Sequence, residues 1–397
     1  MINRINFSKN NYKIIKILNP YKEKVSTQFV GGYVRKLIEG ISSNDVDLAS
    51  NLKIDLLKKI LIKNNIKIFN INLKYQTIKF FYKNNLYEVT SLRKDLYSYH
   101  GRHAIIEETN NWMSDAFRRD FTINAIYCDI NKNLFDPFNG KHDLLNKRLV
   151  FIGNPEIRIK EDYTRIIRFI RFSLEYSVNK DLRKNLFYIN KNIVNLKKNI
   201  STDRLFIELK KLINLNFFLN IIKYPHFQNI LKKIYNIFFF SRIKKLKLLK
   251  DNYKVDFYQI LLILLIGKKK HSTDFCRKFN LSYKISKKFN DMYLQIKLLN
   301  KKNYDNYFIK KQLYYYGKEF TKDFLFLFFC TNKHFSLKKL NIFYKYIDKT
   351  YIPKFPITGN FLINKKNFVE GKDLGIELKK IENKWIKNNF KLKNLFI

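Results

Sequence analysis

The pattern of apolar and polar residues divides the chain into a first part with strands and helices and a remainder that is helical. Short apolar stretches that end at glycines or polar pairs indicate strands, and apolar residues at i, i+3 and i+4 indicate a helix. The patterned stretches are a strand entering a glycine turn in QFVGG (28–32), a strand in DVDLAS (45–50), a helix in KIDLLKKILIKN (53–64), and a β-hairpin in TIKFFYK (77–83) and LYEVTSL (86–92) around Asn84-Asn85. These elements predict a mixed head that extends to about residue 140.

Beyond residue 141 the strand signals fade and long helical patterns rich in Leu, Ile, Phe and Lys take over. Two apolar runs, ILLILLIG (260–267) and FLFLFFC (324–330), are far shorter than the roughly 20 residues that a membrane crossing needs. We expect them to be buried helix faces, and we expect no membrane segment. The fold class predicted is therefore α+β, with an all-helical remainder behind the head.

Composition adds a strong positive charge. Among 397 residues, 78 Lys and Arg stand against 33 Asp and Glu, a formal net charge of +45. A field of this sign attracts nucleic acid, but the abundance of Lys, Asn, Ile and Phe is also what an A+T-rich genome would encode, and both explanations stay open. The cysteines, Cys128, Cys276 and Cys330, are too far apart for a zinc site or a disulfide framework. With no apolar signal core at the N-terminus, we expect a reducing cytoplasm.

The first candidate site combines two glycines with two carboxylates. Gly31 and Gly32 carry no β-carbon that would keep a backbone away from a triphosphate, and Arg35 follows on the same turn. In a strand, Asp45 and Asp47 point to the same face, where two carboxylates can hold two divalent metals about 3.5–4 Å apart for phosphoryl transfer.

Glu88, on the hairpin strand LYEVTSL, is a candidate third carboxylate beside this pair. It would deprotonate an attacking hydroxyl or bind metal, or it is simply a solvated strand residue. The sequence leaves both interpretations open.

A second candidate is the run Arg118-Arg119-Asp120 in RRDFTINA, which we place at a helix start. Adjacent arginines with an aspartate suit a buried ionic network that touches phosphate or ribose. Asp120 is equally suited to be an N-terminal helix cap.

The third candidate is EDYTRIIRFIR, where helical spacing puts Asp162, Arg165 and Arg168 on one side of a helix and Arg171 slightly around it. One interpretation is a surface ion pair of little energetic value. The other is base recognition. A carboxylate beside a guanidinium offers an acceptor and a donor, which match cytosine and adenine on one edge and mismatch uracil and guanine. Mismatched bases would leave charged groups unpaired, a strong form of rejection.

Taken together, GGYVR, DVDLAS, EVTSLRKD, RRDFTINAIYCD, LFDPFNG and IRIKEDYTRIIRFIRF resemble the class II tRNA nucleotidyltransferases, the CCA-adding enzymes. Bacterial poly(A) polymerases share this head within the wider polymerase-β superfamily. The helical stretch STDRLFIELKKLI (201–213) is similar to another family segment, with Asp203 where glutamate is usual. The similarity is specific from about residue 28 to 213. The sequences EDYTRIIRFIRF and AIYCD are most similar to those of enzymes of alphaproteobacterial type.

The resemblance implies a polymerase-β-like head (1–142) followed by an all-helical neck (143–215), body (216–330) and tail (331–397). It implies that Asp45 and Asp47 bind catalytic Mg²⁺ ions, that Gly32 and Arg35 contact CTP or ATP, and that one arginine of the 118–119 pair contacts the nucleotide. Asp162 and Arg165 would read the base, with Arg168 and Arg171 nearby.

The expected reaction is attack on the triphosphate by the 3′-hydroxyl of tRNA, with release of pyrophosphate. The helical remainder would bind tRNA by shape and phosphate contacts. The segment Arg93–Arg102 would be the loop linked to switching from C to A addition, which favours complete CCA addition. The alternatives are a poly(A) polymerase, a partial CC- or A-adding enzyme, and a decayed, non-catalytic RNA-binding protein.

Three residues depart from the family pattern inside the first motifs. Lys36 stands where aspartate is usual, Glu39 where leucine is usual, and Asn44 where a lysine or similar residue is usual. Lys36 removes a structural carboxylate beside the site while sparing both expected metal ligands.

Overall fold

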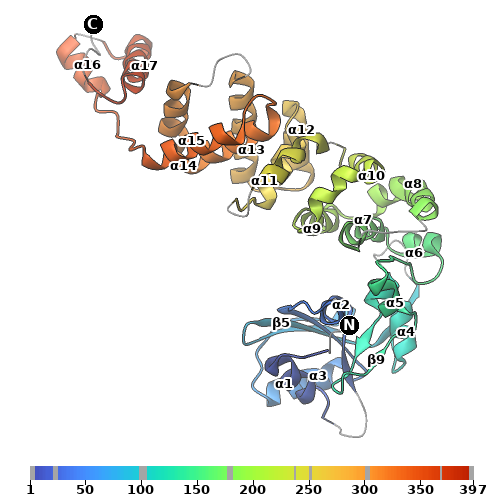
Figure 1. Cartoon of the computed structure of the whole chain (residues 1–397). Helices are drawn as coiled ribbons and strands as arrows, with labels where there is room; N and C mark the ends of the chain where they lie inside the picture. The colour runs from blue at the N-terminus through green and yellow to red at the C-terminus, as the bar shows by residue number, and fades with distance from the viewer. Residues whose placement is uncertain are drawn as a thin grey trace. The chain divides into compact units, whose positions relative to one another are not determined.

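The computed structural model describes residues 5–20, 26–97, 105–176, 182–236, 238–249, 253–299, 305–366 and 369–392 (Figure 1). The chain forms two compact units, Met1–Phe218 and Leu219–Ile397. Unit 1 holds all of the sheet strands and every candidate site residue.

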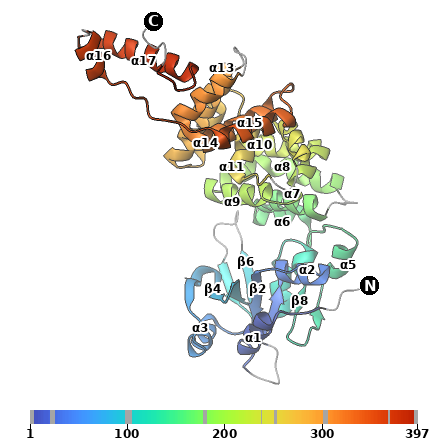
Figure 2. The ribbon, with the colours of Figure 1, turned by 60° about the vertical axis from the view of Figure 1, so that its left-hand side comes forward.

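The centre of unit 1 is a seven-stranded mixed sheet with the strand order β3-β4-β5-β2-β1-β8-β9 (Figure 2). The parallel pair is β2–β5, and the remaining pairs are antiparallel. The strands of this sheet are β1 (Thr27–Val30), β2 (Asp45–Ser50), β3 (Ile68–Asn72), β4 (Thr77–Tyr82), β5 (Asn85–Ser91), β8 (Tyr127–Cys128) and β9 (Leu134–Phe135). A separate antiparallel pair joins β6 (Arg93–Tyr97) to β7 (Ile105–Glu108).

The period of two along the strands separates the two faces of this sheet. Val46 of β2, Phe80 of β4 and Tyr87 of β5 are fully buried, and the hydroxyl of Tyr87 donates to Asn11 Oδ1 of α1 at 2.5 Å. In Figures 1 and 2, α1 and α3 lie on the same side of the sheet. The intervening strand residues, Asp47 among them, therefore point to the opposite face.

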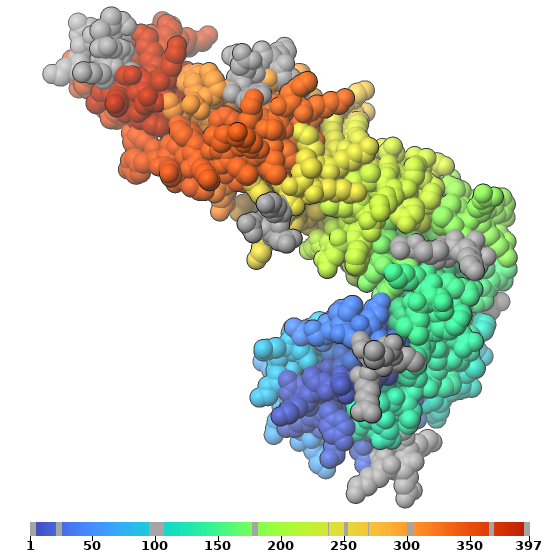
Figure 3. Space-filling model, viewed as in Figure 1, coloured from blue at the N-terminus to red at the C-terminus, as the bar shows by residue number. Residues whose placement is uncertain are grey.

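Helices surround this sheet and continue beyond it in unit 1. They are α1 (Lys9–Ile17), α2 (Gly31–Glu39), α3 (Ile54–Lys63), α4 (Trp112–Phe117), α5 (Gly140–Leu145), α6 (Pro155–Glu161), α7 (Arg165–Tyr176), α8 (Leu182–Asn199) and α9 (Thr202–Ile213), with 3₁₀ turns η1 (Leu73–Tyr75) and η2 (Thr122–Asn124). The space-filling view (Figure 3) shows the blue N-terminal and the green segments of unit 1 packed directly against one another. Pairing of β1 with β8 connects these distant parts of the sequence.

Unit 2 is helical in all of its described residues that form regular elements. Its elements are α10 (Pro225–Tyr235), α11 (Phe257–Leu265), α12 (Lys269–Lys278), α13 (Tyr283–Leu299), α14 (Asn306–Thr331), α15 (Leu337–Lys349), α16 (Gly359–Lys366) and α17 (Lys372–Lys387), with η4 (Phe240–Leu248), while η3 (Phe218–Lys223) begins at the division between the units. Gly317 interrupts α14 with a φ of 79°, so α14 is two helices joined at a kink. The apolar runs of α11 and α14 are buried, as expected. No described helix combines the length and apolar content that a membrane crossing requires.

The predicted α+β head with a helical remainder is confirmed, and the differences lie in details. Asn85 pairs with Tyr82, so the hairpin turn is Lys83-Asn84, one residue earlier than predicted, and Lys83 adopts a φ of 54°. The strands β3 and β6–β9 are absent from the predicted elements. The boundaries after residues 142 and 330 fall inside α5 and α14, and the four-part division stays a prediction.

The DPFNG turn that leads into α5 depends on a glycine. The carboxylate of Asp136 accepts hydrogen bonds from the backbone N–H groups of Gly140 and Lys141 at 2.7 and 2.8 Å. A β-carbon at Gly140 would lie 2.2 Å from the backbone oxygen of Thr122. Because this neighbour is a backbone atom, it cannot move aside by a change of side-chain rotamer.

We therefore expect Gly140→Ala to destabilise unit 1 by about 3 kcal/mol, at the upper end of the usual cost of overpacking. Thermal and urea unfolding of the purified chain would measure this. Gly375→Ala in α17 is the matched control, since nothing lies within 4 Å of its β-carbon position. The control should be neutral or stabilising by up to about 1 kcal/mol, and equal effects of the two variants would contradict the steric argument.

Candidate active site

Three carboxylates occupy the face of the sheet that α1 and α3 leave uncovered. Asp45 and Asp47 lie on β2, and Glu88 on β5 is the register partner of Asp47. Lys79 of β4, the register partner of Glu88, forms an ion pair with it at 2.5 Å between Nζ and Oε2. The carboxylates predicted from the sequence therefore do lie side by side, and Glu88 is partly neutralised by a lysine that the sequence argument missed.

The beginning of α2 faces the carboxylate of Asp47. A β-carbon built on Gly31 or on Gly32 would lie 3.5 Å from Asp47 Oδ2, and Gly31 has a φ of +66°. That backbone conformation favours glycine at position 31, while the 3.5 Å separations are ordinary contact distances that bring the turn against the carboxylate. The first N–H groups of a helix carry partial positive charge, so an anion is favoured here.

Crowding of negative charge changes the acidity of Asp47. Burial, reinforced by the charges of Asp45 and Glu88, raises the pKa of Asp47 from 3.8 to about 6, although Arg119 and Arg35 act in the opposite direction. A divalent cation would relieve this repulsion, and carboxylate oxygens are the ligands that Mg²⁺ prefers. Among the residues that the structure describes, no three His, Cys, Asp or Glu side chains form a complete metal-binding cluster. A metal bound by Asp45 and Asp47 would therefore complete its coordination with water and substrate oxygens.

Arg118 and Arg119 share a carboxylate that the sequence argument overlooked. Asp115, which is 1% exposed, accepts from Arg118 Nε at 2.8 Å and from Arg119 Nη2 at 3.0 Å. The hydroxyl of Tyr127 on β8 donates to the same carboxylate at 2.7 Å. Burial alone would raise the pKa of Asp115, but the two guanidiniums and the Tyr127 hydroxyl outweigh it and hold this pKa well below its usual range.

This pairing corrects the expectation that Arg118-Arg119-Asp120 opens a helix. Arg118 is instead the C-terminal cap of α4, because Asp115 lies three and four residues before the two arginines and binds both across the last turn. In the sequence DAFRR, the spacing of three and four residues between the aspartate and the arginines is the signal that indicates this pairing. Arg119 Nη1 reaches within 3.7 Å of the β-carbon position of Gly31, so the structure brings it to the glycine turn, while its contact with a nucleotide stays a prediction.

Asp120 belongs to an ionic network and caps no α-helix. Its Oδ2 accepts from Arg168 Nε at 2.6 Å, and its Oδ1 accepts from Asn124 Nδ2 at 2.7 Å. Asn124 Oδ1 in turn accepts from Arg35 Nη1. Burial would raise the pKa of Asp120, but Arg168 lowers it well below its usual range. The network ties α2 of the head to α7.

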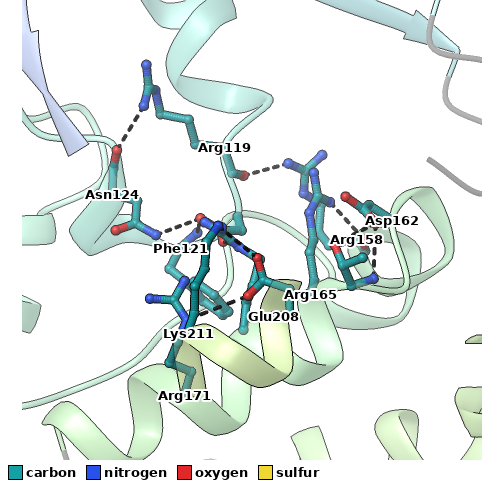
Figure 4. Close-up of polar contacts among 12 residues, drawn as sticks. Arg119, Phe121, Asn124, Arg158, Asp162, Arg165, Arg171, Glu208 and Lys211 are labelled. Atoms are coloured by element: carbon teal, nitrogen blue, oxygen red, sulfur yellow. Dashed lines mark hydrogen bonds and ion pairs between the residues drawn. The ribbon is translucent and has the colours of Figure 1, made fainter. Parts of the chain in front are cut away.

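Three arginines gather around one aromatic ring on α7. The guanidinium carbons of Arg35, Arg168 and Arg171 lie 4.9, 5.6 and 4.3 Å from the centroid of Phe172. Arg171 lies 3.6 Å from Glu208 Oε2 of α9, and Figure 4 shows this contact beside that of Lys211. Burial and the neighbouring guanidiniums Arg168 and Arg35 lower the pKa of Arg171. Such a cluster favours the binding of an anion.

Asp162 and Arg165 do not share a helix face, which corrects the predicted spacing. Asp162 ends α6 in an extended conformation, because its carboxylate accepts from the backbone N–H of Thr164 at 3.0 Å and from the Thr164 hydroxyl at 2.7 Å. Such local bonds compete with a continuous helix. The second oxygen of Asp162 pairs with Arg204 Nη2 of α9 at 2.9 Å, a partner that the sequence did not reveal.

Arg165, the first residue of α7, has other partners. Its Nη1 contacts Glu161 Oε2 at 2.8 Å, and its Nη2 donates to the backbone oxygen of Arg118 at 3.2 Å. Arg158 Nη2 donates to the backbone oxygen of Arg119 at 2.5 Å (Figure 4). Arg165 of the EDYTR segment is thus bonded to the backbone of Arg118, and Arg158 to the backbone of Arg119, the arginine that reaches the glycine turn.

Lys36, which departs from the family pattern, has a structural role of its own. Its Nζ donates to Ser43 Oγ at 3.0 Å, and that hydroxyl donates to the backbone oxygen of Asp45 at 3.1 Å. The lysine therefore supports the loop that leads into β2. For Glu39, burial raises the pKa of the carboxyl, and Arg35 partly opposes this. Of the expected loop Arg93–Arg102, residues 98–102 lie outside the described residues.

Two models of known protein domains match parts of this chain. The model of the poly A polymerase head domain matches residues 27–150, and the model of a tRNA nucleotidyltransferase domain 2 matches residues 255–394. The two models thus match one domain in each unit of the chain. The chain is also 28% identical over 395 residues to the CCA-adding enzyme of Streptococcus uberis, covering 93% of this chain and 91% of that one.

A second relative of the chain is more similar over a shorter stretch. The mitochondrial CCA tRNA nucleotidyltransferase 1 of Mus musculus is 37% identical over 196 residues, which cover 48% of this chain and 44% of that enzyme. The chain therefore spans about half the length of the first curated relatives that it matches. A crystal structure of the Bacillus stearothermophilus CCA-adding enzyme with CTP has a TM-score of 0.71 at 18% identity, over 96% of this chain and 94% of that one. This likeness shows that the fold is shared.

The raised pKa of Asp47 gives a stability prediction. Because folding raises this pKa from 3.8 to about 6, the folded chain binds the proton more tightly than the unfolded chain, and charged Asp47 destabilises it increasingly as pH rises from 4 to above 6. With all divalent metal chelated, we expect Asp47→Asn to raise the free energy of unfolding at pH 8 by roughly 2 kcal/mol, and by less at pH 5.

Denaturant unfolding at the two pH values measures this difference. Glu107→Gln, at an exposed carboxylate of β7, is the control and should show little change. An Asp47→Asn variant that is less stable than the parent at pH 8 would contradict the proposed crowding of charge.

Proposed function

We propose that this chain adds C, C and A to the 3′ ends of tRNA molecules that lack them, using CTP and ATP without a nucleic-acid template. The observation that carries the proposal is the approach of the α2 glycine turn to Asp47, with the β-carbon positions of Gly31 and Gly32 each 3.5 Å from Asp47 Oδ2. A phosphate cradle beside paired carboxylates suits nucleotidyl transfer. The match to a tRNA nucleotidyltransferase domain and the names of the two relatives support tRNA as the acceptor.

Mg²⁺ is the metal that we propose for Asp45 and Asp47. When bound there, it would neutralise triphosphate charge and favour the ionised form of the attacking hydroxyl. The clustered carboxylates and the raised pKa of Asp47 fit such an ion.

The side chains of the site would divide the remaining work. The N–H groups at the start of α2, with Arg35 and Arg119 nearby, would hold the triphosphate oxygens. The 3′-hydroxyl oxygen would form a bond to the α-phosphorus as the bond to the β-phosphate oxygen breaks, and pyrophosphate leaves. Glu88 is our candidate to receive the hydroxyl proton, with Lys79 holding its carboxylate in place.

Base choice would rest on Asp162 and Arg165, with Arg118, Asp120, Arg168 and Arg171 supporting them. Asp162 is bonded to Arg204, and Arg165 to Glu161, so an incoming base would exchange its hydrogen bonds for these contacts. Cytosine and adenine present an amino donor and a ring acceptor that an aspartate and an arginine can satisfy together.

We propose a reducing cytoplasm as the setting of this protein, which the free and buried cysteines support.

The match to the poly A polymerase head domain favours one second candidate, a poly(A) polymerase with the same catalytic residues. A tRNA transcript lacking CCA, incubated with the chain, Mg²⁺ and either or both of CTP and ATP, separates the candidates. Complete CCA addition predicts extension by three residues that requires both nucleotides. Long A tails would indicate a poly(A) polymerase, extension that stops early would indicate a partial enzyme, and no incorporation would contradict an enzymatic function.

The metal assignment makes a separate prediction. Asp45→Ala should reduce incorporation to background while leaving tRNA affinity nearly unchanged, because the variant removes a metal ligand and no RNA contact. Filter binding and gel-resolved extension measure the two quantities. Asp55→Ala, at an exposed aspartate of α3, is the control and should keep full activity. An active Asp45→Ala variant would show that the metal assignment is wrong.

A further inference from the structure

The catalytic face of the sheet continues beyond the carboxylates. Asp45 of β2 pairs with Leu86 of β5, and Leu86 pairs with Phe81 of β4. Directly paired residues on neighbouring strands have their side chains on the same face. Because adjacent strands are about 4.8 Å apart, Phe81 lies roughly 10 Å from Asp45 across this face.

Phe81 forms an exposed aromatic pair with Phe69 of β3. The two rings are stacked, with centroids 5.0 Å apart and an interplanar angle of 23°, and the residues are 59% and 50% exposed. Phe69 is the extra residue of a β-bulge between Ile68 and Asn70, and bulges redirect side chains next to active sites. Two large apolar rings stacked in solvent form a ready surface for a ligand.

The charge around this aromatic pair identifies the chemistry of the ligand. Of the seven lysines between Asp55 and Glu88, Lys58, Lys59 and Lys63 lie on α3, on the other side of the sheet, whereas Lys79 and Lys83 lie two residues from Phe81. Glu88 itself is paired with Lys79. A second copy of this chain carries the same net charge of +45 and would be repelled. Exposed aromatic rings with surrounding lysines are typical of surfaces that bind single-stranded nucleic acid, where bases stack and lysines attract the phosphates.

We propose that Phe81, backed by Phe69, is a base-stacking site for the single-stranded 3′ end of the RNA substrate. The site holds a base just upstream of the nucleotide whose 3′-hydroxyl is presented at Asp45 and Asp47. This inference rests on the proposed function and deepens it, since it names where the acceptor strand lies on the head.

Base stacking suits an RNA 3′ end whose last bases change during the reaction. Every base offers a π-face, so a stacking site tolerates any base, whereas hydrogen bonds to base edges would not. As each residue is added, the strand can move by one nucleotide and present a new base to the same ring. Base choice then stays with the incoming nucleotide, and Phe81 acts as a positioning residue for the primer.

Steady-state kinetics with tRNA lacking CCA tests the inference. Phe81→Ala should raise the KM for tRNA by about tenfold, the effect of one lost base–aromatic stack. The kcat and the KM for CTP should be unchanged, and Phe81→Trp should restore the KM for tRNA. Tyr12→Ala is the matched control, because Tyr12 is 48% exposed on α1, which lies on the opposite side of the sheet, and it should behave as the parent.

A second readout does not require activity. A short RNA with 2-aminopurine just upstream of its 3′ end should lose fluorescence on binding the parent chain, and much less on binding Phe81→Ala. If the parent extends no RNA but quenches this probe, the proposed function fails and the stacking site stands.

The inference is overturned if Phe81→Ala leaves both the KM for tRNA and the quenching unchanged, or if Phe81→Trp fails to restore them. A dimer of the parent chain that Phe81→Ala dissociates, seen by sedimentation, would assign the pair to contact between copies and would also overturn it.

Discussion

The ion pair of Arg119 with the buried carboxylate of Asp115, supported by Tyr127, is the interaction on which the rest of the site depends. The pair lies inside unit 1, with the carboxylate of Asp115 1% exposed and its Oδ2 3.0 Å from Arg119 Nη2. Removing the carboxylate of such a pair costs about 3–5 kcal/mol, because the guanidinium is left without its partner. The same guanidinium extends to the glycine turn, and the backbone oxygen of the same residue accepts from Arg158.

The site keeps its negative and positive charges on different elements. Asp45, Asp47 and Glu88 form a row on the sheet face, where burial and then their mutual repulsion raise the pKa of Asp47. Arg35, Arg168 and Arg171 gather around Phe172. Only a ligand that brings both cations and anions satisfies the two halves together. A metal-bound nucleoside triphosphate is such a ligand, and its binding is the physical basis of the proposed activity.

Much of this arrangement could be predicted from local sequence, because short periods decide it. Alternation along DVDLAS placed Asp45 and Asp47 on one face, and the two glycines before Arg35 indicated a close backbone approach. The short strands β8 and β9, of two residues each, carry no periodic signal, and they form because β8 pairs with the edge of β1 and β9 pairs with β8.

The predictions that were wrong at the site failed for a common physical reason. Helical spacing suggested that Asp162 would pair with Arg165, but the Thr164 side chain and backbone bind Asp162 locally and end the helix there. The actual partner, Arg204, is 42 residues further along the chain. No local pattern reveals such a pairing, since only the packing of α9 against α7 brings it about.

The central claim is that protein side chains alone select the base, without a nucleic-acid template. Equilibrium binding of CTP, ATP, UTP and GTP to the chain, with Mg²⁺ present and RNA absent, tests it most directly. We expect CTP and ATP to bind, and UTP and GTP to bind about tenfold more weakly, a difference in binding free energy of about 1.4 kcal/mol. Equal affinity for all four nucleotides would contradict it.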